Sequence, residues 1–465
     1  MLNLSLANGI FPQELKITKL IPLFKANDNM IFSNYRPIAL LSVFSKIFEK
    51  IMYTRLIKFL TKNNVIYELQ FGFLKNHSTE MALTLLIDRI TLAMDEGKYS
   101  FGIFLDFSKA FDTVNHDILF NKLYKYGIRG LAHQWLKSYL TNREQYVTYG
   151  GIESNRCINT CGVPQGSILG PLLFLLYIND IANVSNYFFM ILFADDTNLF
   201  VSADSLSEIK DKINLELNKV VTWLHANKLS LNVNKSHFMI FSRRKIVFDT
   251  DIILNNQVID RVFHTKFLGV QIDSKILWHN HILYVKGKIA RGLGILKKAR
   301  KKLNADTLLT LYYSFIYPHI NYCLEVWGNA CKDKINSLLK IQKKCIRLLC
   351  DAEYRAHTPP LFKSKEILPI SLLYKAKVLF FTHKHQNDKL PHIFADFFIF
   401  NCNVHTYNTR NKDRFRAPLA RTDIRLKTIR FTAPKIVNEH FKDIDFSLKF
   451  PKFKKCIKRL LITYI

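Results

Sequence analysis

The chain has 465 residues, of which 49% are hydrophobic and 13% aromatic, and this composition excludes an intrinsically disordered protein. Lysine and arginine number 67 against 37 aspartate and glutamate, so the net charge is +30. Residues 1–270 carry a net charge of only +6, whereas residues 271–465 carry +24. A polyanion explains this concentration of positive charge best, so we expect a nucleic acid as partner.

Several other classes of protein do not fit the sequence. The apolar run 168–178 comes closest to a membrane span but is shorter than the roughly 18 residues required, so we expect no membrane association. The first ten residues lack the cationic start of a secretory signal. The eight cysteines form no CxxC pair, which favours a reduced, intracellular protein without a structural zinc site.

The first half of the chain mixes helical and strand patterns. Residues 38–61 keep apolar side chains three and four positions apart, which predicts an amphipathic helix. The runs Phe101–Leu105 and Phe188–Phe193 are typical of buried strands, and acidic residues follow each of them. Between these runs, the glycines and prolines of residues 162–171 predict a tight loop followed by an apolar helix. After about residue 273 the pattern becomes mostly helical, with lysine and arginine on the polar faces.

Acidic residues at the ends of the two predicted strands are candidates for chemistry. The pair Asp195-Asp196 lies between two apolar runs, which predicts a hairpin with two carboxylates at its tip. Adjacent buried carboxylates repel each other unless a cation such as Mg²⁺ or Mn²⁺ neutralises them. A solvated turn is the alternative for an isolated pair. Asp106 comes at the end of the upstream strand. Its alternative role is that of a helix N-cap, but Ser108 and Asp112 are also candidates for the cap. We assign the cap to Asp112.

Three motifs in this order resemble the palm of a reverse transcriptase: FLDFSKAFD at 104–112, GVPQGS at 162–167 and FADD at 193–196. The sequence is most similar to the reverse transcriptases of non-LTR retrotransposons of the Jockey-like kind, over roughly residues 10–410. Six further segments share in the resemblance, namely residues 34–52, 70–79, 227–239, 267–273, 314–328 and the YNTRN sequence at 407–411.

The resemblance implies an α+β right-hand polymerase. It places the fingers and palm at residues 1–272 and a helical thumb at 273–350, and we expect the remaining 351–465 to be a basic, helical nucleic-acid-binding region. The implied activity is that of an RNA-directed DNA polymerase, which adds deoxynucleotides to a primer 3′-hydroxyl on an RNA template. The implied partners are therefore template RNA, primer DNA and deoxynucleoside triphosphates, whereas the sequence leaves the question of protein partners open.

The resemblance also assigns catalytic residues. Asp106, Asp195 and Asp196 correspond to the catalytic carboxylates that bind two Mg²⁺ ions, or Mn²⁺ in their place, with help from the backbone carbonyl of Phe107. Lys235 corresponds to the lysine after the catalytic hairpin, which would protonate the departing pyrophosphate. A solvated surface lysine is the alternative for Lys235.

Five residues correspond to nucleotide-binding positions of the family. Phe111 would lie beneath the sugar, where a 2′-hydroxyl would clash with its ring, although core packing is an alternative. Arg36 would reach the triphosphate, since a planar guanidinium offers paired donors to phosphate oxygens. Lys25 is a second candidate for that contact, with a plain surface role as its alternative. Gln165 and Gly166 would line the nascent base pair.

Leu268, Gly269 and Val270 resemble the primer-holding hairpin, in which glycine lets the strand backbone approach closely. An ordinary buried strand is the alternative. Relatives often have arginine after the QxGF motif, whereas this chain has Leu74 and Lys75, so the contact made there is not carried over.

The sequence also bears on the origin and the location of the protein. Because nothing in it matches an endonuclease, the resemblance implies the reverse transcriptase portion of an open reading frame shortened at its N-terminus. An inactive element remnant that folds and binds RNA is the rival reading, and a cellular polymerase or intron-encoded maturase is a second. We expect an intracellular protein of the nucleus, the cytoplasm or both, and not a secreted one.

Overall fold

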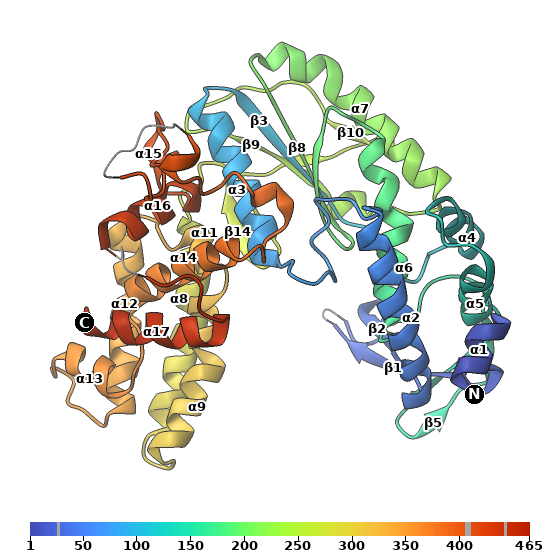
Figure 1. Ribbon diagram of the computed structural model, residues 1–465, viewed down its shortest axis with the longest axis horizontal. Helices are drawn as coiled ribbons and strands as arrows, with labels where there is room; N and C mark the ends of the chain where they lie inside the picture. Colours follow the sequence, from blue (N-terminus) through green and yellow to red (C-terminus); the bar gives the residue numbers. More distant parts are fainter. Residues whose placement is uncertain (26–27, 405–410, 441–443) are drawn as a thin grey trace.

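The computed structural model describes residues 1–25, 28–404, 411–440 and 444–465. Figure 1 shows a central sheet that joins two limbs, with the N-terminal helices on one side and the helices after residue 273 on the other. Residues 407–410 of the YNTRN segment lie outside the described ranges.

Helices make up most of both limbs. Those before residue 273 are α1 (Leu2–Asn8), α2 (Val43–Lys62), α3 (Thr79–Asp95), α4 (His116–Lys125), α5 (Gly130–Leu140), α6 (Leu169–Ile178) and α7 (Leu206–Ala226). Those after it are α8 (His279–Ala299), α9 (Ala305–Phe315), α10 (Tyr317–Asn321), α11 (Leu324–Trp327), α12 (Lys332–Leu349), α13 (Thr358–Ser364), α14 (Ile370–Gln386), α15 (Asp423–Leu426), α16 (Ile429–His440) and α17 (Phe450–Thr463). The prediction of a mostly helical second half is confirmed. Within the described ranges, no helix combines the length and the apolar composition needed to cross a membrane.

The central sheet carries the predicted acidic strands. Its strand order is β12 (Asp260–Arg261), β9 (His237–Phe241), β3 (Tyr99–Leu105), β8 (Asp196–Ala203) and β7 (Phe189–Phe193). All neighbouring pairs are antiparallel except β12 and β9, which run parallel. Both strands predicted from the apolar runs are confirmed, to within two residues at their ends.

Alternation along β3 divides the molecule into two hydrophobic cores. Successive side chains of a strand point to opposite faces of the sheet. Phe101, Ile103 and Leu105 therefore enter one core with α6 and α7, whereas Phe104 enters a second core with α3 and the helices after residue 273. The sheet is covered on both faces, and its hydrophobic strands are buried.

A second sheet lies in the N-terminal limb and consists of β2 (Tyr35–Leu40), β1 (Thr18–Phe24), β4 (Arg143–Tyr149), β5 (Ile152–Glu153) and β6 (Cys157–Asn159). The helix predicted over residues 38–61 is wrong at its start, because α2 begins only at Val43. Residues 35–40 instead pair with β1 along the whole length of the strand. Periodicity within one segment cannot show such pairing, because the partner lies elsewhere in the chain.

Two short hairpins lie between α7 and α8. One is formed by β10 (Ile253–Leu254) and β11 (Gln257–Val258), and the other by β13 (His264–Phe267) and β14 (Val270–Asp273). The second hairpin leads directly into the helical region, since β14 packs against α8.

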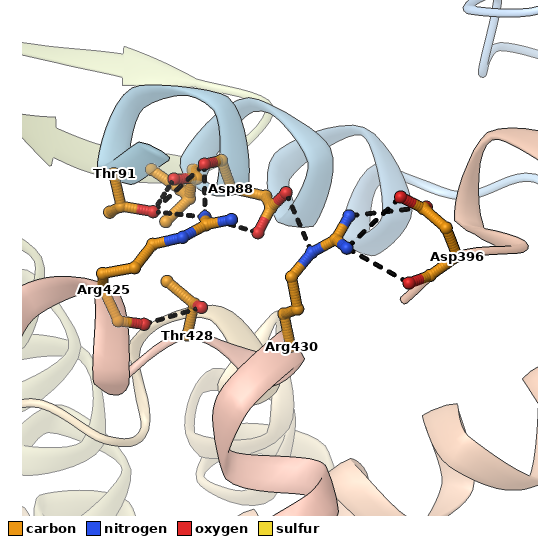
Figure 2. A network of polar contacts seen from close by, with 7 residues as sticks. Asp88, Thr91, Asp396, Arg425, Thr428 and Arg430 are labelled. Carbon is orange, nitrogen blue, oxygen red and sulfur yellow. Dashed lines mark hydrogen bonds and ion pairs between the residues drawn. The ribbon is translucent and has the colours of Figure 1, made fainter. Parts of the chain in front are cut away.

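The C-terminal region is attached to α3 by buried ion pairs, which Figure 2 shows. Asp88 on α3 accepts a hydrogen bond from Nη1 of Arg425 at 2.6 Å, and the same nitrogen donates to Thr91 Oγ1 at 3.0 Å. The Asp88 and Arg425 side chains are only 6% and 5% exposed. Nε of Arg430 lies 3.4 Å from the second oxygen of Asp88, and its guanidinium also pairs with Asp396.

Two further contacts strengthen this attachment. Asp95, at the end of α3, accepts hydrogen bonds from the amide and the hydroxyl of Thr422 at 2.6 and 2.7 Å. At the other end of α3, Glu80 pairs with Lys377 of α14. One hydrophobic core runs through α3, α8, α12, α14, α16 and α17. The predicted divisions at 272 and 350 stay predictions, but the helices after residue 350 share a core with α8, α12 and α3.

We predict that Arg425→Ala lowers the free energy of unfolding by about 3–5 kcal/mol, because it leaves the carboxylate of Asp88 buried beside a single remaining cation. Chemical unfolding of both proteins measures the difference. The control is Lys427→Ala, which removes an exposed pair with Asp423 and should cost less than about 1 kcal/mol. Equal losses in the two variants would show that the buried pair has no special weight.

Candidate active site

Asp106 directly follows β3, and a loop from a distant part of the chain fixes its backbone. Its amide donates to Ser236 Oγ at 3.2 Å, and its carbonyl accepts from the amide of Asn232 at 2.8 Å. The Ser236 hydroxyl in turn donates to the carbonyl of Asn232. The neighbouring Phe107 forms an isolated bridge with Leu231. These contacts hold the start of the Asp106 side chain in place, while the carboxylate keeps 43% of its exposure.

Asp195 and Asp196 lie at the turn of the β7–β8 hairpin, as predicted. The last paired residues are Phe193 and Asp196, so Ala194 and Asp195 form a two-residue turn. Ala194 has a φ of +56°, a backbone conformation that residues with a side chain adopt rarely. Because β8 pairs with β3 in the register Thr197 to Leu105, the turn lies at the same end of the sheet as Asp106.

The three carboxylates influence one another electrostatically. Burial raises the pKa of Asp195 above its ordinary value, and the charge of Asp106 raises it further, while Arg36 and Lys25 oppose the shift. Desolvation together with the charges of Asp195 and Asp106 raises the pKa of Asp196 to about 6, although this side chain keeps contact with solvent. Three like charges in one partly desolvated place attract a cation.

Cationic side chains surround the carboxylates. Lys235 Nζ lies 3.9 Å from Asp106 Oδ2, and this pair remains open to solvent. Arg36 and Lys25, both exposed, lie close enough to Asp195 to oppose its pKa shift. Lys235 thus pairs with one of the three carboxylates, and Arg36 and Lys25 act on a second one through their charge.

The carboxylates suit a hard divalent cation in their chemistry, because charged oxygens are the ligands that Mg²⁺ and Mn²⁺ prefer. Their side chains are not gathered at ligand distance, however. Over the described ranges, no group of three or more His, Cys, Asp or Glu side chains is arranged so that it could hold a metal ion. The three carboxylates therefore fit a divalent cation by their charge and by their oxygen atoms. Binding of the cation would require the three side chains to turn toward one another.

The aromatic candidate Phe111 is half-buried between two other phenylalanine rings. Its ring stacks on that of Phe174 with centroids 4.4 Å apart, and the exposed ring of Phe73 meets it edge-on at 6.1 Å. The stacking on Phe174 provides the packing expected of a core residue. The remaining exposure leaves part of the ring available to a ligand.

The Gly/Pro loop contacts both β2 and the segment after Asp106. The side-chain amide of Gln165 donates to the carboxylate of Asp112 at 2.8 Å, and the backbone carbonyl of Gln165 accepts from the amide of Ala39 at 2.7 Å. Gly166 has a φ of +119°, and a Cβ atom there would lie 2.5 Å from the carbonyl oxygen of Ala39. The prediction that Asp112 caps a helix is wrong, because Asn115 accepts the capping bond of α4. Asp112 is held by Gln165 instead.

The predicted primer-holding residues form the turn of the β13–β14 hairpin. Leu268 and Gly269 are its two central residues, both with positive φ, and Val270 is fully buried. The hydroxyl of Tyr322, in the helical region, donates to the carbonyl of Leu268 at 2.7 Å. A Cβ atom at position 269 would lie 3.0 Å from the ring of Tyr322, so a larger residue there would displace the ring and would also strain the backbone, whose φ is +81°. The turn is thus fixed by Tyr322 of the helical region.

Sequence reasoning missed several positioning residues. Glu49 is fully buried on α2, and its carboxylate accepts from the amides of Ile168 and Leu169 at 2.6 and 3.2 Å, which caps α6. A charged residue at a core-facing position of the predicted helix was the available signal. Ser236 and Tyr322 gave no comparable signal, since their roles depend on partners far along the chain.

Comparison with known proteins identifies the family. A family profile described as reverse transcriptase (RNA-dependent DNA polymerase) matches residues 25–272, more than half of the chain. The chain belongs to the reverse transcriptase family. Together with the observed mixture of helices and sheet, this membership confirms the predicted fold class.

The curated relatives are polymerases of mobile elements. The probable RNA-directed DNA polymerase from transposon X-element of Drosophila melanogaster is 29% identical over 346 residues, which cover 73% of this chain and 38% of the relative. The RNA-directed DNA polymerase from mobile element jockey of the same species is 28% identical over 362 residues, 75% of this chain and 39% of the relative. The expected similarity to Jockey-like elements is confirmed. The chain spans under two fifths of the length of these relatives.

Among solved structures, apo telomerase from Candida Tropicalis matches with 12% sequence identity and a TM-score of 0.45. This match covers 77% of the present chain and 63% of the telomerase chain.

Proposed function

We propose that this protein is an RNA-directed DNA polymerase of a non-LTR retrotransposon. The observation that carries the proposal is the meeting of Asp106, Asp195 and Asp196 at one end of the central sheet, with cationic side chains beside them. Family membership supports the reaction class. Primer extension on an RNA template with deoxynucleotides and Mg²⁺ tests the proposal, and an inert protein that still binds RNA would favour the rival reading of a remnant.

In this proposal the three carboxylates, assisted by the carbonyl of Phe107, would hold two divalent cations. When bound, such ions activate the primer hydroxyl and stabilise the charge that develops on the pyrophosphate. Lys235 lies on the Asp106 side of the carboxylates, and its ammonium would hold the proton that the leaving pyrophosphate takes up.

The other assigned residues would bind and orient the nucleotide and the primer. Arg36 and Lys25, whose charges act on Asp195, would bind the triphosphate. Phe111 would exclude a 2′-hydroxyl, and Gln165 with Gly166 would line the base pair, since this loop adjoins the segment that carries Phe111.

The turn at Leu268, Gly269 and Val270 would hold the primer strand. The fixed geometry of this turn supports the assignment, because a rigid backbone positions a primer end better than a mobile one.

The template would bind largely through the positive charge of the second half of the chain. Helix α17 is an example, because Phe453, Ile457 and Leu461 pack into the core while its other face exposes lysine and arginine. An exposed row of cations is an electrostatic footprint for a nucleic-acid backbone.

We predict that Asp195→Asn and Asp106→Asn each abolish primer extension, because each removes a negative charge and replaces one carboxylate oxygen by an amide nitrogen that cannot bind a cation. The cationic surfaces are untouched, so RNA affinity should stay within about twofold of that of the parent protein. Single-turnover extension and RNA binding, measured on the same preparations, provide the comparison. Extension within about tenfold of the parent rate in either variant would refute the assignment.

The Phe111→Ala variant should accept ribonucleotides, because the ring that meets a 2′-hydroxyl is removed. Extension with ribo- and deoxynucleotides on the same protein gives the discrimination ratio, in which any loss of folded protein cancels. Unchanged discrimination with a loss of about 3–5 kcal/mol of stability would mean that Phe111 serves only to pack on Phe174.

The third test concerns α17 and replaces Lys452, Lys455 and Arg459 by glutamine. Deleting residues 351–465 would instead uncover the shared core. If these three side chains contact phosphates, RNA affinity falls and the slope of log affinity against log salt flattens by about 2.

A matched control for α17 is a triple glutamine variant of the exposed lysines 62, 125 and 137, which removes the same charge from the N-terminal limb. Equal effects of the two triple variants on RNA affinity would mean that α17 contributes only through the net charge of the protein and not as a binding surface.

A further inference from the structure

The segment Leu69–Phe71 extends the central sheet along its β7 edge. Gln70 and Leu192 form a parallel bridge. The amide of Phe71 donates to the carbonyl of Leu192 at 2.7 Å, and the amide of Leu192 donates to the carbonyl of Leu69 at 3.0 Å. The strand that leads into the catalytic turn is therefore held on its outer side by a segment from the fingers.

The Gln70 side chain reaches the catalytic turn itself. Gln70 is only 1% exposed, and its Oε1 accepts hydrogen bonds from the amide of Ala194 at 3.0 Å and from that of Gly72 at 2.8 Å. An amide inside a two-residue turn has no acceptor across the hairpin, so it needs a partner from elsewhere. Gln70 provides that partner one residue before Asp195.

Gly72 holds the same turn from a second side. A Cβ atom at this position would lie 2.5 Å from the amide nitrogen of Ala194, so only glycine permits the observed approach. The next residue, Phe73, contacts the ring of Phe111. The segment thus touches both the turn that carries Asp195 and the proposed sugar gate.

We propose that Gln70 is a positioning residue that fixes the Ala194–Asp195 turn and thereby sets the affinity of the site for its divalent cation. This inference rests on the metal-binding part of the proposed function. Replacing a residue that orients a metal ligand without touching the metal commonly lowers the metal affinity by about 10–100-fold. A residue that merely fills the core would lower stability without changing how tightly the folded protein binds the ion.

The test replaces Gln70 by methionine, which keeps the length of the side chain and removes the acceptor. The matched control is Gln342→Met on α12. Gln342 is equally buried and holds Tyr312, Leu368 and Ile370 by comparable hydrogen bonds. Binding of Mn²⁺ to the full chain is measured by calorimetry without nucleic acid, beside the Mg²⁺ dependence of primer extension and the unfolding midpoint.

We expect both variants to lose stability, and only Gln70→Met to bind Mn²⁺ about tenfold more weakly and to need correspondingly more Mg²⁺ for extension. If Gln70→Met does not fold, Gln70→Asn serves as the test instead, because its side chain is one methylene shorter and its acceptor lies further from the turn. This variant should also bind Mn²⁺ more weakly than the parent, although by a smaller factor than expected for Gln70→Met. Parent-like Mn²⁺ affinity in the folded variant would overturn the inference. A parent protein that binds Mn²⁺ without extending primers would refute the polymerase proposal and leave this inference standing, whereas a parent that binds no Mn²⁺ would overturn both.

Discussion

Mutual repulsion among Asp106, Asp195 and Asp196 is the constraint that the surrounding structure has to satisfy. Burial and the neighbouring charges raise the pKa values of Asp195 and Asp196, so the folded chain keeps these side chains together at a cost. Relaxation would move them apart unless the backbone on each side were fixed. The contacts of Ser236 and Gln70 provide that fixation, because each binds the backbone at or next to a carboxylate.

Helix α3 connects this site to the helices after residue 273. The segment that holds the Ala194–Asp195 turn comes shortly before α3. The hydroxyl of Tyr322 forms hydrogen bonds with Thr79, the first residue of α3, and with the carbonyl of Leu268 in the β13–β14 turn. Along its length, α3 carries Glu80, Asp88 and Asp95, which bind the C-terminal region. A change in the packing of that region can therefore reach both hairpins through one rigid helix.

Local patterns in the sequence were sufficient to predict the acidic strands, the β7–β8 hairpin and the loop before α6, because strand burial and turn chemistry depend on neighbouring residues. They failed at residues 38–42, because residues 38–40 pair with β1 and α2 begins only at Val43. They also failed for the supports of the site. Glu49 caps a helix 119 residues further along, and Gln70 binds an amide 124 residues away. Such partners become visible only once the chain is folded.

The account depends most directly on the claim that the three carboxylates form a divalent-cation site. Thermal unfolding tests this claim. It is measured for the parent protein and for Asp195→Asn and Asp196→Asn, first with a chelator and then with increasing Mg²⁺. The control is Asp211→Asn, on the exposed face of α7. With the chelator, both site variants should unfold at a higher temperature than the parent, because a like charge is gone. With Mg²⁺ the parent should gain more stability than either variant. A parent whose unfolding does not respond to Mg²⁺, beside site variants that behave like the control, would contradict the account.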